Sequence, residues 1–161
     1  MTEEVSELTK ALLAVIPVLS GGLIGIAGSF GVSYFQQRQK KSETLKKKAE
    51  EALQHLYRCI IWLHNYRHQC LIDGEIKIAN FPPLDTAEAI VALYFPEAES
   101  ELDEFTKKHS EVASVAIGLG GERIAQGEIP KDHSERWSMA FSSLKPSFNA
   151  LKAKIRELSL K

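Results

Sequence analysis

The residues best suited to chemistry are two cysteines and two histidines within one stretch of the chain. Cys59 and Cys70 are eleven positions apart, which is about 16 Å along a helix axis and excludes a disulfide between them. Both recur among regularly spaced apolar residues, so we predict buried, reduced thiols. His64 and His68 are four positions apart and could begin a zinc site. A third ligand and an H-E-x-x-H context are missing, so we expect neither a metal nor a cofactor.

Four other features contain residue types found in active sites, and each has a structural explanation. Five carboxylates within residues 97–104 suit the positive end of a helix dipole. The glycine-rich segment 118–121 lacks the Gly-Lys-Ser/Thr of a phosphate loop and is interpreted as a connector. Adjacent side chains in 132–134 point apart and cannot form a Ser-His-Asp relay. His109 interrupts an apolar pattern and is expected to be a hydrogen-bonded core or edge histidine. We therefore predict that the protein is not an enzyme.

The composition is that of an ordinary single domain, but the charges are segregated. The chain has 161 residues, 25% of them charged, and a formal net charge of −1. These values exclude a mainly disordered chain, a polytopic membrane protein and a disulfide-stapled mini-domain. Residues 1–10 carry a net charge of −2, residues 11–37 carry no charge, residues 38–48 carry +5 and residues 49–161 carry −4. Near-neutrality thus arises from blocks of opposite sign.

The uncharged segment 11–35 predicts a transmembrane helix. Its 25 residues contain no Asp, Glu, Lys, Arg or His, and a helix of that length crosses a hydrocarbon core about 30 Å thick. Two alternatives are a buried helix of a soluble protein and a cleaved signal peptide. The first is disfavoured by the absence of a polar face, and the second by the acidic start and the length of the apolar run.

The distribution of basic residues predicts the orientation of the span. One lysine precedes it, and six basic residues follow it within 13 positions. The positive-inside rule then places residues 1–10 outside and residues 49–161 in the cytoplasm. The basic juxtamembrane segment 36–48 is expected to contact lipid headgroups rather than nucleic acid. Its headgroup-contacting residues are Arg38, Lys40, Lys41, Lys46, Lys47 and Lys48.

Small residues within the span predict helix association. Gly21, Gly25 and Gly28 are spaced i, i+4, i+7, which places them on one helical face. Glycines let two backbones approach closely in lipid. This face is expected to mediate a homo-oligomer or to dock on the span of a partner membrane protein. The alternative interpretation is a simple anchor, because glycine is frequent in membrane helices.

Residues 49–161 predict an all-α antiparallel helical bundle. Apolar residues alternate in steps of four and three from Leu45 to Cys70, from Ala98 to Leu119 and from Trp137 to Leu158, as in helices that pack along a seam. The first helix is expected to end near Asp73-Gly74 and the third at the 118–121 glycines. A short helix should run from an Asp85 cap to about residue 94, and Pro146 should kink the last helix.

These features favour a single-pass membrane protein with a cytoplasmic binding or scaffold module. The alternative function is an oligomerising membrane effector that perturbs the bilayer under control of the bundle. An enzyme with an unrecognised site is a third hypothesis. The charge-free span, the small-residue face and the bundle without a catalytic motif favour the first.

Overall fold

A computed structural model describes residues 2–74, 76, 82 and 84–160, with side chains from residue 32 onward. The described part is helical and contains no strand. The helices are α1 (Thr2–His68), α2 (Leu84–Tyr94), α3 (Glu99–Gln126) and α4 (His133–Ser159). A π-helical turn, η1 (Gln69–Asp73), follows α1, and a 3-10 turn, η2 (Pro96–Ala98), precedes α3. The prediction of an all-α bundle is confirmed.

The chain divides into two compact units, residues 1–43 and 44–161. The backbone of the first unit is helical. The predicted span 11–35 lies largely outside the residues whose side chains are described, and only its last four residues are included. Within the described residues, no helix has both the length and the apolar character that crossing a bilayer requires.

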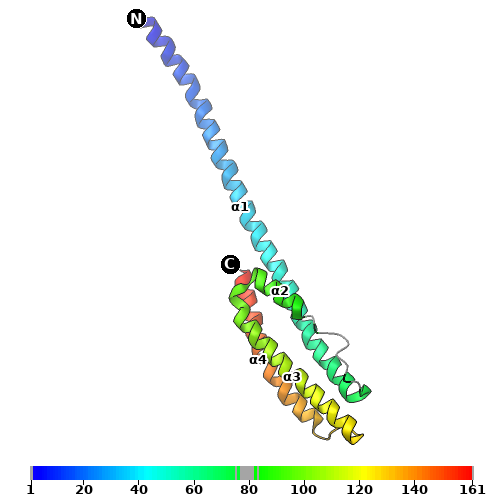
Figure 1. Cartoon of the computed structure of the whole chain (residues 1–161). Helices are drawn as coiled ribbons and strands as arrows, with labels where there is room; N and C mark the ends of the chain where they lie inside the picture. The colour runs from blue at the N-terminus through cyan, green and yellow to red at the C-terminus, as the bar shows by residue number, and fades with distance from the viewer. Residues whose placement is uncertain (1, 75, 77–81, 83, 161) are drawn as a thin grey trace. The chain divides into compact units, whose positions relative to one another are not determined.

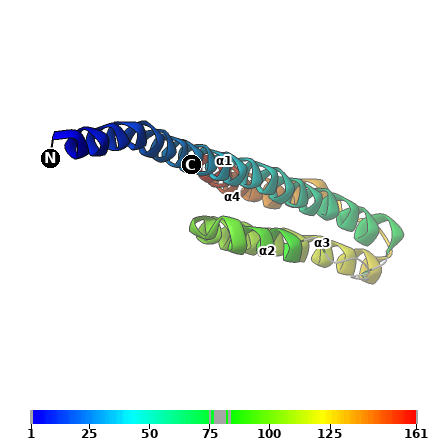
Figure 2. The same ribbon diagram turned by 90° about the horizontal axis from the view of Figure 1, so that it is seen from above.

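The second unit is a four-helix arrangement in which successive helices reverse direction (Figures 1 and 2). Lys48 of α1 lies 5.6 Å from the ring centroid of Tyr94, at the end of α2. On α3, the His109 ring lies 5.7 Å from Trp62. On α4, Phe148 lies 5.0 Å from Tyr57. Together these contacts show that α2, α3 and α4 each pack against the part of α1 that belongs to this unit.

The three predicted seams form most of the core, and α2 contributes Ala87, Ile90 and Val91 to it. Every seam residue from Ala49 onward is buried except Phe141, which is partly buried, and Leu45 also packs against the core at its edge. The largest fully enclosed side chains are Phe95, Phe105, Leu56, Leu63, Leu119, Leu144, Leu151 and Ile155. The alternation of four and three residues therefore identified the buried face of each long helix, because only one stripe of a helix faces its neighbours.

Most predicted helix ends agree with the structure. Gly74 adopts φ 68° after the π turn, as expected for a glycine that ends a helix. The short helix begins at Leu84, so Asp85 lies within its first turn and not at the cap. Helix α4 continues through Pro146 on its exposed side.

The predicted end of the third helix at residues 118–121 was wrong. Helix α3 continues to Gln126 and ends only at Gly127, whose φ is 75° and whose N–H donates to the Arg123 carbonyl at 2.8 Å. Gly120 is buried against η1, where an added Cβ would lie 2.9 Å from the Cβ of Cys70. The glycine at 120 thus permits close packing inside the helix, and no connector is present there.

Candidate functional site

The side chains around the predicted helix-association face lie outside the described residues. Gly21, Gly25 and Gly28 belong to the segment of α1 whose surroundings lie outside the described residues. Their role therefore remains a prediction from spacing.

The predicted headgroup contacts divide into two kinds in the structure. Arg38, Lys40, Lys41, Lys46 and Lys47 are exposed. Lys48 instead belongs to the bundle, where its Nζ lies 2.6 Å from a carboxylate oxygen of Glu51 and 5.6 Å from the centroid of the Tyr94 ring. The hydrogen bond to Glu51 raises the pKa of Lys48. Five of the six basic side chains are therefore exposed, three in the first unit and two at the start of the second.

Both cysteines are buried and free, as the apolar spacing predicted. Burial raises the pKa of the Cys59 thiol to about 12, and burial also raises the pKa of Cys70. The thiolate is the nucleophilic and metal-binding form of cysteine. These two thiols are therefore suited to packing and not to catalysis.

His109 is a buried, hydrogen-bonded core histidine, which confirms the interpretation from sequence. Only 2% of the residue is exposed. Its Nε2 lies 3.3 Å from the Cys59 carbonyl oxygen, and the ring stacks 5.7 Å from Trp62. Because a carbonyl only accepts, Nε2 carries the proton. Burial lowers the pKa of His109, and the bond to Cys59 opposes that shift only in part.

Because His109 is buried, we predict that the protein loses stability in mild acid. Above the ordinary histidine pKa of 6.5 the ring is neutral in both the folded and the unfolded chain. Below it, the unfolded chain binds a proton that folded His109 resists, so the free energy of unfolding falls as pH falls. Each unit of pKa difference corresponds to about 1.4 kcal/mol. Urea unfolding between pH 7.5 and 5 should show this slope.

The variant His109→Gln keeps an N–H donor but cannot titrate, so its unfolding free energy should change less across that pH range. The matched control is His68→Gln, since His68 is exposed. It should retain the slope of the unchanged protein. A slope that survives in His109→Gln would assign the pH dependence to other groups.

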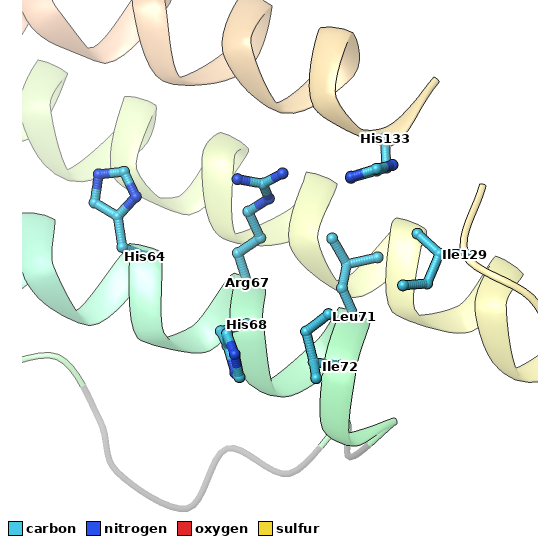
Figure 3. A pocket seen from close by; sticks show the side chains of 7 residues that line it. All are labelled: His64, Arg67, His68, Leu71, Ile72, Ile129 and His133. Atoms are coloured by element: carbon cyan, nitrogen blue, oxygen red, sulfur yellow. The ribbon is translucent and has the colours of Figure 1, made fainter. Parts of the chain in front are cut away.

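A pocket of about 260 Å³ lies where the end of α1 and η1 meet the segment before α4. Figure 3 shows the side chains that surround it. Its polar wall consists of three histidines and one arginine, and its apolar wall of three aliphatic residues. The lining residues are His64, Arg67, His68, Leu71, Ile72, Ile129 and His133.

Arg67 and His133 extend toward one another across the pocket (Figure 3). The Arg67 guanidinium carbon lies 5.3 Å from the centroid of the Trp137 ring, a cation–π contact that orients the side chain. Its Nε is buried without a hydrogen-bond partner among the described residues. The Nδ1 of His133 lies 2.8 Å from the Pro130 carbonyl oxygen. That bond holds the imidazole at the first position of α4.

The His64 and His68 pair lines this pocket but forms no metal site in the described part of the chain, where no cluster of three or more suitable ligands occurs. The His64 ring packs 4.5 Å from Phe141, and His68 is exposed. The two imidazoles are therefore positioned as polar walls of a cavity and are not brought to one point.

The other candidate groups have structural roles. Asp132 lies 3.7 Å from Arg136 in an ion pair, while His133 donates to Pro130, so residues 132–134 form no catalytic relay. The carboxylates at 99 and 101 lie in the first turn of α3, as their charge predicted. Sequence reasoning missed Arg67 and His133 as neighbours. Arg67 shares a helix face with His64 and His68, but residues 129–133 are brought to that face only by the tertiary fold.

The comparisons with known proteins provide no family for this chain. No family model matches the sequence, and the searches of curated proteins and of solved structures found no match to it.

Proposed function

We propose that the protein is a single-pass, membrane-anchored binding or scaffold module whose helical bundle lies at the cytoplasmic face. The observation that carries the proposal is the run of 25 uncharged residues followed by six basic residues within 13 positions. A charge at the centre of a membrane helix costs about 2.5–3.5 kcal/mol, so such a run is typical of a bilayer span. Basic residues on one flank set its direction.

The second unit supports a binding role. It has a continuous apolar core formed by four helices, which makes it a rigid platform. Its two thiols are buried, and the one histidine that lies deep in its core is bonded to a backbone carbonyl. The exposed basic side chains at 38–47 would attract anionic lipid by roughly 1 kcal/mol each. An anchored platform for a protein partner, or for further copies of the chain, agrees with these features.

Fractionation of cells that express the full-length chain tests the anchor. The protein should sediment with membranes, resist extraction by alkaline carbonate and dissolve only in detergent. The double variant Leu23→Arg, Ile26→Arg should shift most of the protein to the supernatant, because each charge raises the cost of insertion by about 2.5–3.5 kcal/mol. An unchanged chain that stays in the supernatant without detergent would contradict the proposal.

Protease protection tests the orientation. Protease added outside intact cells should leave the bundle uncut, and cutting should require permeabilised membranes. Cleavage of the bundle from outside would reverse the proposed topology.

Self-association through the small-residue face has a separate test. Gly25→Ile should weaken the signal of a membrane two-hybrid assay, since a branched side chain separates the two backbones. Leu23→Ile, which changes a residue off that face, is the control and should leave the signal unaltered. Equal signals from both variants would remove Gly21, Gly25 and Gly28 from the proposal.

Rapid loss of membrane potential on expression would favour the bilayer-perturbing effector instead.

A further inference from the structure

The pocket between α1 and the start of α4 has the electrostatic character of an anion site. Four of its seven lining residues are arginine or histidine, and none is acidic. This contrasts with residues 49–161 taken together, whose net charge is −4. The carboxylate of nearby Asp132 pairs with Arg136 at 3.7 Å. The lining therefore presents positive charge that no acidic lining residue neutralises.

Arg67 supplies the strongest donors. Its guanidinium is held over the Trp137 ring, and its terminal nitrogens reach into the pocket (Figure 3). A guanidinium matches two oxygens of a phosphate or carboxylate with parallel hydrogen bonds. Because the Nε of Arg67 lacks a hydrogen-bond partner among the described residues, the group is not engaged by a competing carboxylate at that atom.

His133 distinguishes between the two kinds of anion. Its Nδ1 must donate to the Pro130 carbonyl, so in the neutral ring Nε2 bears a lone pair and accepts. Below its second pKa of about 6, a phosphate monoester keeps one O–H that it can donate to this nitrogen, whereas a carboxylate has none. His133 is also the first residue of α4, where the partial positive charge of a helix N-terminus favours an anion.

The apolar wall of the pocket indicates which kind of group the ligand carries besides its anion. Leu71 is buried, while Ile72 and Ile129 are half-exposed at 50% and 37%, and all three line the cavity. At about 260 Å³ the cavity falls just below the usual range of roughly 300–1,000 Å³ for small-molecule sites. We propose that this pocket binds a small phosphate monoester that carries one compact apolar group.

The place of the pocket on α1 favours a water-soluble ligand over a lipid headgroup. Arg67 is 19 residues beyond Lys48, the last residue of the basic segment, and this is about 28 Å along the helix. A headgroup held by residues 38–48 thus could not also occupy the pocket. This proposal needs only the second unit and does not depend on the membrane anchor.

Calorimetric titration of the full-length chain in neutral detergent tests the proposal, with phenyl phosphate, inorganic phosphate and benzoate as probes. Phenyl phosphate should bind most tightly. Arg67→Met keeps an unbranched side chain but removes the guanidinium, and it should weaken the binding of phenyl phosphate at least tenfold. Arg58→Met, which removes an exposed arginine of the same helix, should leave binding unchanged. His133→Phe should reduce the preference for phenyl phosphate over benzoate. A melting curve of each variant tests whether it is folded.

Three results would overturn the proposal. One is equal binding of phenyl phosphate to Arg67→Met and Arg58→Met, and another is benzoate binding as tightly as phenyl phosphate to the unchanged chain. The third is no heat with any soluble probe while Arg67→Met loses association with phosphatidic acid vesicles, which would assign the site to a lipid headgroup. The anchor is tested by sedimentation, so failure of one proposal is distinguishable from failure of the other.

Discussion

Replacing Phe105 by alanine is expected to lower the free energy of unfolding by about 3–5 kcal/mol, the usual cost of removing a buried phenyl ring. Phe105 has no exposed surface. Its ring centroid lies 5.9 Å from that of His109 and 5.9 Å from that of Phe148. The ring thus joins α3 to α4 beside the one buried histidine. Its loss leaves a cavity that helices fixed by neighbouring contacts cannot close.

Urea unfolding followed by circular dichroism measures this effect. Leu93→Ala is the control, because Leu93 is 76% exposed and surface changes usually stay within about 0.5 kcal/mol. If Phe105→Ala and Leu93→Ala lowered the free energy of unfolding equally, the packing of α3 against α4 around Phe105 would be wrong.

Substitution of Gly120 should also destabilise the protein strongly, by about 1–3 kcal/mol for Gly120→Leu. A Cβ at this position would lie 2.9 Å from the Cβ, 3.2 Å from the carbonyl oxygen and 3.4 Å from the Cα of Cys70. Two of these atoms are backbone, so the side chain of Cys70 cannot relieve the clash by changing rotamer. The α3 helix and η1 would have to separate.

The neighbouring glycines provide control variants whose expected change in stability has the opposite sign. A Cβ at Gly118 or Gly121 meets nothing within 4 Å. Alanine exceeds glycine in helix propensity by about 0.8–1 kcal/mol, so Gly118→Ala and Gly121→Ala should raise the melting temperature, while Gly120→Leu lowers it. Three changes of the same sign would contradict the close contact between α3 and η1.

These glycines show why local rules succeeded elsewhere and failed here. A run of three glycines in four positions is locally a poor helix, because each glycine weakens a helix interior. From sequence alone the segment therefore indicated a helix end. Helix α3 continues through this segment because Leu119 is buried on the same seam as Ala116. Gly120 also allows η1 to pack closely against the helix. Tertiary packing outweighed the local preference, and that contact joins residues 50 positions apart.

The candidate site shows the same limit. His64 and His68 drew attention as a pair because residues four apart share a helix face. Arg67 lies on the same helix face, because it follows His64 by three residues. Ile129 and His133 could not be assigned to that face, since the segment 127–132 has no repeat that orients it. Its position depends on where Gly127 ends α3 and on how α4 packs against α1.

The sequence by itself determined that the second unit is helical and which stripe of each long helix is buried, because a period of 3.6 residues and the apolar character of a side chain are local properties. It also determined the blocks of charge on which the proposed anchor rests. Only the tertiary structure decided that α3 passes through its glycines and that Arg67 faces His133. Both features depend on contacts between segments that are distant along the chain. A local sequence pattern does not determine which distant segments come into contact.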